Sequence, residues 1–88
     1  MDGYCSDLLS DVIANAPSRS IWITIQTHEN IVAASLLRDV GAVLVSGGRK
    51  IPPETIKRAN EEGVVVLSSE KNSYHCACKL SKILEEKG

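Results

Sequence analysis

The chain has 88 residues, enough for one domain and too few for two, so we treat residues 1–88 as a single domain. The hydrophobic share of 43% is ordinary for a globular protein, and no apolar run approaches the roughly 20 residues that cross a bilayer, so we expect no membrane association. The net charge is −1, and the lysines and arginines are scattered without interleaved aromatic residues, which argues against nucleic acid as a partner.

The first half of the chain alternates helix and strand patterns. Residues 6–16 predict a helix, with Ser6 as its N-cap and Pro17 after its end. Residues 21–26 predict a strand, because β-branched and aromatic residues recur there with a period of two. Residues 30–40 carry apolar side chains at helical spacing and predict a second helix.

The second half continues this alternation. Residues 42–45 and 64–67 are short, wholly apolar runs, typical of strands that are covered on both faces. Residues 52–62 predict a helix that starts with proline and is followed by glycine, and residues 72–87 predict a terminal helix. Alternating helices and strands indicate a parallel sheet with right-handed crossovers. We therefore predict an α/β fold, a three-layer α/β/α sandwich around a small, mostly parallel sheet.

Ligands of open parallel sheets bind beyond the carboxyl ends of the strands. Three polar connections lie at that edge and run into helix N-termini, where free N–H groups favour an anion. They supply the candidate ligand-binding residues Thr27, His28, Asn30, Ser46, Gly47, Gly48, Arg49, Ser68 and Ser69. The sequence thus predicts a small anionic ligand, such as a nucleotide or a phosphometabolite, at this edge of the sheet.

The turn of Gly47, Gly48 and Arg49 is the most specific of these features. Two glycines permit positive φ angles and the close approach of a ligand, and the arginine offers a bidentate contact to phosphate or carboxylate. The alternative is a plain tight turn whose arginine is solvated or paired with an acid. The sequence contains no P-loop, because no glycine-rich stretch ends in Gly-Lys-Ser or Gly-Lys-Thr, and it contains no dinucleotide fingerprint.

Catalysis has weaker support than binding. His28 and Glu29 are adjacent side chains that could act as acid and base, but no pattern in the sequence places a nucleophile beside them. Asn30 or Thr27 fits a helix cap, and the serines after the last strand fit strand-end or capping roles. We therefore predict no catalytic residue.

The three cysteines point to structural roles. An odd number, with two of them one residue apart, does not fit a disulfide framework, and reduced thiols indicate a cytoplasmic protein. A metal site at His75, Cys76 and Cys78 is disfavoured, because helical residues two apart point in different directions, whereas ligand pairs are usually three or four apart. We predict buried small-residue roles for Cys76 and Cys78, and neither a metal nor a cofactor.

Several segments together resemble the DRTGG-domain family. They are residues 3–12, residues 22–33, the turn at 46–49 with Pro53, and residues 66–68. The family occurs as a module in HPr serine kinase/phosphorylases, some phosphotransacetylases and some CBS-containing pyrophosphatases, and as small stand-alone proteins. The resemblance implies an α/β/α domain with regulatory or assembly roles and no catalysis of its own. The literal Asp-Arg-Thr-Gly-Gly string is absent, and relatives usually carry a further N-terminal segment, which leads us to expect a sheet that lacks one strand.

The leading interpretation is a non-catalytic regulatory or sensor module that forms a homodimer and binds a small anionic ligand. The dimer is expected because a three-stranded sheet leaves an open edge. It is also expected because the first helix carries a wide apolar stripe, formed by Leu8, Leu9, Val12 and Ile13. A monomer whose first helix packs wholly on its own sheet is the alternative. The resemblance adds a second reading, a ligand-free dimeric adaptor for a separate enzyme such as a hydrogenase-type redox complex, and a small enzyme is the third.

Overall fold

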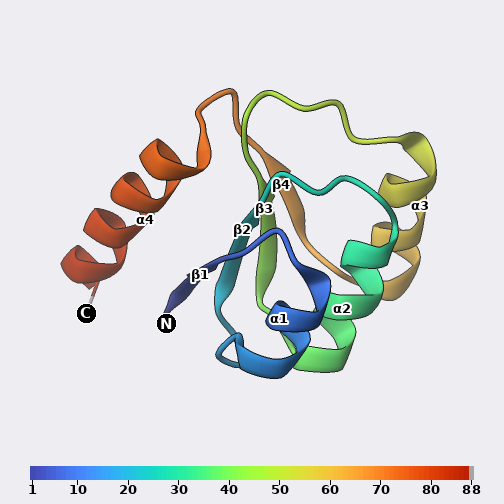
Figure 1. The fold of residues 1–88 in the computed structure, drawn as a ribbon, viewed down its shortest axis with the longest axis horizontal. Coiled ribbons are helices and arrows are strands. Elements are labelled where there is room, and N and C mark those ends of the chain that lie inside the picture. The colour runs from blue at the N-terminus through green and yellow to red at the C-terminus, as the bar shows by residue number, and fades with distance from the viewer. Residues whose placement is uncertain (88) are drawn as a thin grey trace.

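Four strands alternate with four helices in the computed structural model, which describes residues 1–87 (Figure 1). The chain begins with a strand and ends with its longest helix. The elements are β1 (Gly3–Cys5), α1 (Leu9–Asn15), β2 (Ile21–Thr24), α2 (Asn30–Arg38), β3 (Ala42–Val45), α3 (Pro53–Glu62), β4 (Val66–Ser68) and α4 (Ser73–Lys87).

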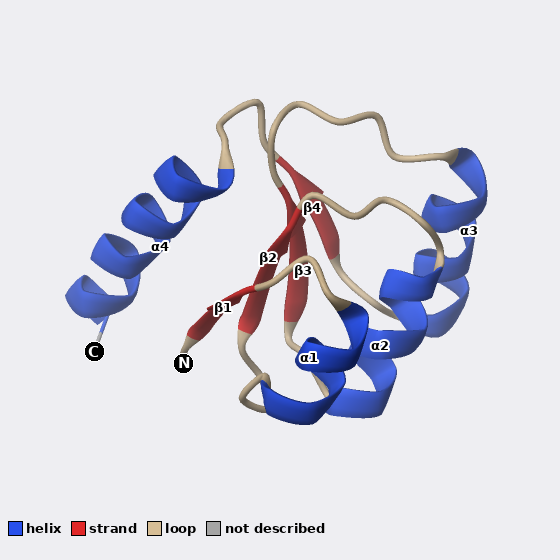
Figure 2. Ribbon diagram, viewed as in Figure 1, coloured by secondary structure: helices blue, strands red, loops and turns tan. Residues whose placement is uncertain are grey.

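All neighbouring strands pair in parallel, in the order β1-β2-β3-β4. Each crossover steps to the adjacent strand in the same direction, so the three connecting helices lie on one face of the sheet. The last helix, α4, lies on the other face and packs against β1 and β2 (Figure 2). The predicted α/β/α sandwich around a small parallel sheet is therefore confirmed.

The sheet has one strand more than the sequence patterns predict. Strand β1 pairs with β2, so the prediction of a three-stranded sheet was wrong. Two backbone bonds flank the pair: Ile21 N–H donates to the carbonyl of Asp2 at 2.9 Å, and Ser6 N–H donates to that of Ile23 at 3.2 Å. Three residues that include a glycine are too few to show a period of two, which explains why the pattern missed them.

The first helix is shorter than predicted. It starts at Leu9 rather than at Ser6, because residues 6–8 form a turn that leads out of β1. The Ser6 hydroxyl accepts a hydrogen bond from the Leu8 N–H at 3.3 Å, within this turn. Ser6 is therefore not the N-cap, and the residue at that position, Leu8, makes no side-chain capping bond.

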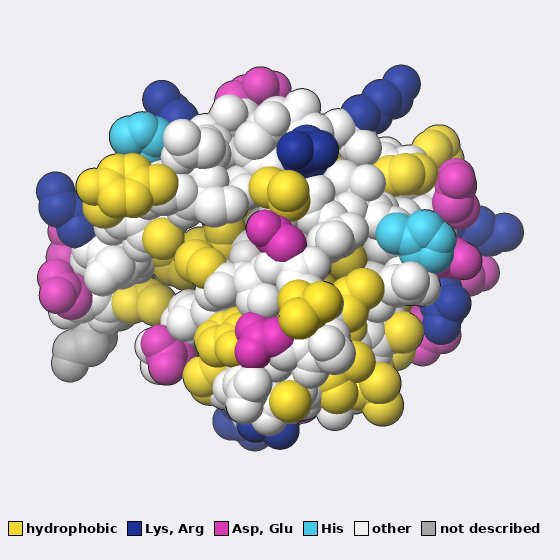
Figure 3. Space-filling model, in the orientation of Figure 1, with side chains coloured by type: hydrophobic (Ala, Val, Ile, Leu, Met, Phe, Trp, Pro, Cys, Tyr) yellow, Lys and Arg dark blue, Asp and Glu magenta, His cyan; other side chains and the backbone are white. Residues whose placement is uncertain are grey.

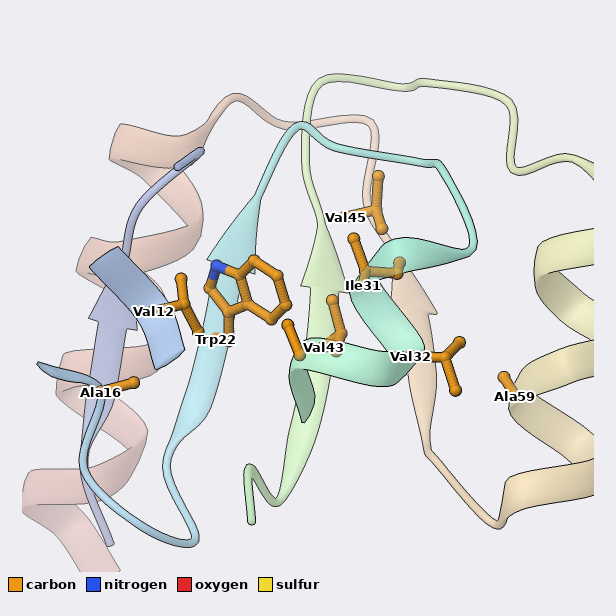
Figure 4. Packing of buried hydrophobic residues seen from close by; sticks show 9 residues of the cluster. Val12, Ala16, Trp22, Ile31, Val32, Val43, Val45 and Ala59 are labelled. Carbon is orange, nitrogen blue, oxygen red and sulfur yellow. The ribbon is translucent and has the colours of Figure 1, made fainter. Parts of the chain in front are cut away.

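The main core lies between the sheet and helices α1, α2 and α3. Trp22 is fully buried at its centre, and Figure 4 shows the indole beside Val12 of α1, with Val43 next along the sheet. The indole N–H donates a hydrogen bond to the carbonyl of Ser6 at 2.7 Å, so the only polar atom of this side chain is satisfied. The cluster comprises Val12, Ala16, Trp22, Ile31, Val32, Ala34, Val43, Val45 and Ala59.

The opposite face of the sheet is only half covered. Because α4 packs on β1 and β2, the outer faces of β3 and β4 have no helix of this chain above them among residues 1–87. Val43 and Val45 of β3 are buried in the main core, but Leu67 of β4 is half exposed. The prediction that both apolar strands are covered on both faces was therefore wrong for β4, which is an edge strand.

The cysteines occupy two different environments. Cys76 of α4 is buried, as predicted, with its Sγ 3.6 Å from the carbonyl of Lys71. Cys78 is exposed, so the prediction of a buried role was wrong for this residue. In residues 1–87 no three His, Cys, Asp or Glu side chains come close enough to hold a metal ion. Within the same residues, every helix is too short or too polar to cross a bilayer.

Candidate binding site at the carboxyl ends of the strands

The connections that follow the strands meet at one edge of the sheet, at the top of the view in Figure 1. Direct hydrogen bonds join them. The hydroxyls of Ser46 and Ser73 lie 2.6 Å apart, and the Thr55 hydroxyl donates to the carbonyl of Thr27 at 2.7 Å. Ser68 ends β4, next to Val45 in the sheet register. The predicted site residues therefore belong to one edge, and several of their polar groups bond to neighbouring loops and helix ends.

The glycine turn uses its conformational freedom to bind a neighbouring loop. Gly47 and Gly48 have φ angles of 84° and 65°, as the sequence predicts for two adjacent glycines in a tight turn. Their N–H groups donate to the carbonyls of Lys71 and Ser69, at 2.7 and 2.8 Å. These two donors are therefore engaged, and an anion at the turn would have to displace two backbone carbonyls.

We expect Gly48→Val to lower the free energy of unfolding by about 1–2 kcal/mol, the usual cost of holding a side chain in the left-handed region. A Cβ at this position would also lie 2.7 Å from Oε2 of Glu70, but that atom ends a flexible side chain and moves aside at little cost. Urea unfolding measures the loss. Gly63→Val is the matched control, because Gly63 has a φ of 71° and open space around its Cβ position. A Gly48→Val loss far above the Gly63→Val loss would show that the Glu70 loop cannot yield.

The N-terminus of α2 is capped by a histidine side chain. His28 Nδ1 accepts a hydrogen bond from the Asn30 N–H at 3.0 Å. The next two N–H groups, of Ile31 and Val32, donate to the carbonyls of His28 and Glu29, each at 3.0 Å. The predicted capping roles of Thr27 and Asn30 are therefore taken by the His28 side chain.

The N-terminus of α4 is closed in a similar way. The Asn72 carboxamide oxygen accepts a hydrogen bond from the His75 N–H at 3.1 Å, and the Asn72 carbonyl accepts one from the Cys76 N–H at 3.0 Å. Before it, Ser69 Oγ accepts from the Lys71 N–H at 3.1 Å. Ser69 therefore stabilises the turn before α4, a structural role that the sequence allowed. Few N–H donors at this helix end remain for an anion.

Arg49, Lys50 and Lys71 are exposed cationic side chains of this edge. Arg49 and Lys50 follow the glycine turn directly, whereas Lys71 lies in the loop after β4. Arg49 and Lys50 lie between the glycine turn and α3, whose N-terminus offers few donors because Pro52 and Pro53 have no N–H. Of the residues that the sequence predicts for an anion site, Arg49 is the exposed one that carries a guanidinium.

Asp7 belongs to this edge and was missed by the sequence patterns. Its Oδ1 accepts hydrogen bonds from the Thr24 hydroxyl at 3.0 Å and from the Ile25 N–H at 2.9 Å. Its carbonyl accepts one from the Gln26 side chain at 3.0 Å. Asp7 thus ties the loop after β1 to the end of β2. Had β1 been recognised, the position of Asp7 just after a strand would have placed it here.

A second acidic residue of this region is held by hydrogen bonds. Asp11 accepts from the Tyr4 hydroxyl at 2.7 Å and from the Asn15 carboxamide at 2.9 Å. The bonds from Asn15, Tyr4 and Ser6 lower the pKa of the Asp11 carboxyl, whereas the bond to Asp11, burial and the nearby negative charge raise the pKa of the Tyr4 phenol. The ionised carboxylate and the neutral phenol are therefore the forms that the fold favours.

These two shifts predict a pH dependence with opposite signs. Above its unfolded pKa of about 3.9, the ionised Asp11 adds to the free energy of unfolding. This stabilisation is lost as the pH falls through the lower folded pKa. Below its unfolded pKa of about 10, the neutral Tyr4 phenol adds to the free energy of unfolding. This stabilisation is lost as the pH rises through the higher folded pKa. Urea unfolding at a series of pH values should show that Asp11→Asn reduces the acid loss of stability. An unchanged acid limb in this variant would contradict the assignment.

Comparison with known proteins gives one match. A family model that describes the DRTGG domain matches residues 10–83, which is most of the chain. No curated protein and no solved structure matches it.

Proposed function

The chain belongs to the DRTGG-domain family, and from this premise we propose that it is a non-catalytic regulatory module that acts as a homodimer. Family membership indicates a regulatory module. At the candidate site, the polar groups are mainly used to hold loops together, which fits a scaffold better than a catalytic centre. The proposed dimer rests on one apolar surface of the chain.

An apolar patch crosses helices α1 and α2, and it is the observation that carries the proposal. Figure 3 shows hydrophobic side chains gathered over these two helices. Leu8 is 64% exposed and Leu37 is 72% exposed, which is unusual for two leucines on one surface. A shallow groove of about 240 Å³ lies between the helices. We call this surface the α1–α2 patch, and its apolar members are Leu8, Leu9, Ile13, Ala33 and Leu37.

A second copy of the chain is the occupant that suits this patch. The residues that line the groove are uncharged, with Asn30 as the polar member. A two-fold axis places the same residues of both copies against each other, and an uncharged surface does so without opposing like charges. Val12, which the sequence assigned to the same stripe, is buried in the core, while Leu8 and Ile13 stay exposed. The exposed side of the stripe is thus free for a partner.

The proposal is tested by following backbone amide NMR signals during dilution. We expect the signals of residues 8–16 and 30–38 to shift as the dimer dissociates. The amides of α3 provide an internal control, because α3 lies outside the patch, and they should keep their positions. Shifts confined to other elements, or no shift at any concentration, would contradict a dimer through this patch.

The small anionic ligand remains a prediction, and Arg49 is the side chain that would hold it. A thermal-shift screen of nucleotides and sugar phosphates tests it, since a ligand at one hundred times its Kd stabilises by about 2.7 kcal/mol. We expect Arg49→Ala to remove the stabilisation while leaving the Tm of the free protein unchanged, because the side chain is exposed. A compound that stabilises both proteins equally would place the ligand elsewhere.

A further inference from the structure

The uncovered half of the sheet is large enough for one more helix. Neighbouring strands lie about 4.8 Å apart and packed helices about 8–10 Å apart, so four strands accommodate two helices side by side. On this face the chain supplies only α4, which packs on β1 and β2. The position above β3 and β4 is left open in residues 1–87.

The floor of this open position is apolar. Leu44 of β3 and Ile83 of α4 line a groove of about 270 Å³ between the sheet and the helix. Leu67, opposite Leu44 in the register, is 49% exposed, and Val65 continues the same side of the strand. We call these four residues the apolar floor.

The side of α4 that borders the floor is basic. Lys71, in the loop just before α4, lines the same groove as His75 and Lys79 of the helix. Lys82 lies about one turn after Lys79, in the adjoining hollow. No acidic side chain of residues 1–87 lines either hollow. We call these four residues the basic rim. An apolar strip beside three lysines and a histidine matches an occupant whose apolar stripe is flanked by acidic side chains.

We propose that this face binds an acidic amphipathic helix of a partner protein. The apolar stripe of that helix would lie on the apolar floor, and its carboxylates would face the basic rim. This is the helix-in-groove mode, in which apolar residues at helical spacing give affinity and flanking charges select the partner. The site lies on the opposite face of the sheet from the α1–α2 patch, so it does not depend on the proposed dimer.

A second copy of the chain does not supply such a helix. The α1–α2 patch is uncharged, and the exposed Ile56 of α3 is a single apolar side chain followed directly by Lys57 and Arg58. A two-fold contact through the groove itself would place the two basic rims against each other. The occupant is therefore a different protein, whose recognisable feature is a leucine-rich helical stripe flanked by glutamate or aspartate.

Two labelled peptides of 15 residues, the length of α4, test the proposal by fluorescence anisotropy. Both carry leucines at helical spacing; one has glutamates beside the stripe and the other has lysines. We expect the glutamate peptide to bind the full chain at least about tenfold more tightly than the lysine peptide. We also expect its binding to weaken as salt is added, because the selecting contacts are charged.

Variants locate the binding surface. Lys79→Glu and Leu67→Glu should each weaken binding of the glutamate peptide about tenfold or more, while Lys57→Glu on α3 and Leu37→Glu on the α1–α2 patch should change it less than about twofold. Equal binding of both peptides, absence of binding at about 1 mM, or insensitivity to Lys79→Glu would overturn the proposal. Retention on phosphatidylserine vesicles that is lost in Lys79→Glu, without peptide binding, would identify a lipid surface instead.

Discussion

Replacing Trp22 by alanine is expected to lower the free energy of unfolding by about 3–5 kcal/mol. The indole is fully buried at the centre of the sheet and contacts residues from more than one helix. Its removal leaves a large cavity and also leaves the carbonyl of Ser6 without its 2.7 Å partner. Small domains are stable by only about 5–15 kcal/mol, so the variant should be close to unfolded at room temperature.

Urea unfolding followed by circular dichroism measures this loss, since the variant has no tryptophan to report fluorescence. Trp22→Phe is the graded control, because it keeps most of the apolar volume and removes the indole N–H. We expect it to cost clearly less than the alanine variant. A loss below about 1 kcal/mol for Trp22→Ala would contradict the position of this residue at the centre of the core.

Leu37→Glu is expected to convert the proposed dimer into a monomer. The exposed leucine lies in the α1–α2 patch, so in a two-fold dimer each copy would bury a glutamate with no cation beside it. We expect the dimer to weaken by about 100-fold or more, with little change in the Tm of the monomer. Size-exclusion chromatography with light scattering measures the mass of the variant. Leu8→Glu should behave in the same way.

Leu67→Glu is the matched control for that experiment. It places the same charge on a half-exposed leucine at the other face of the sheet, outside the α1–α2 patch. It should therefore leave the dimer intact. Dissociation by Leu67→Glu, with no effect of Leu37→Glu, would move the dimer interface to the face of α4.

The sequence predicts the elements best where a pattern is complete within one segment. Residues 42–45 form β3 as predicted, since a wholly apolar run of four suits a central strand. Helix α3 ends at Glu62 as predicted, because Gly63 takes the left-handed conformation that closes a helix. Strand β1 was not predicted, because its three residues form a strand only through pairing with β2.

Features that depend on distant packing were not predictable in this way. Leu67 is exposed because α4 packs on β1 and β2 and leaves β4 uncovered on that face. The residues of β4 alone do not indicate where α4 packs. At the candidate site, topology brought the predicted loops to one edge. Which donors stay free depends on contacts such as that between Gly47 and Lys71, which are far apart in the chain.

Sedimentation equilibrium of the unmodified chain, from about 1 to 100 μM, tests the central claim most directly. A regulatory module that works as a homodimer should approach a mass of about 19 kDa, twice the 9.5 kDa of the chain, at the upper end of this range. Dilution should shift the average mass toward the monomer. A mass of 9.5 kDa at every concentration would contradict the homodimer and leave the α1–α2 patch without its proposed partner.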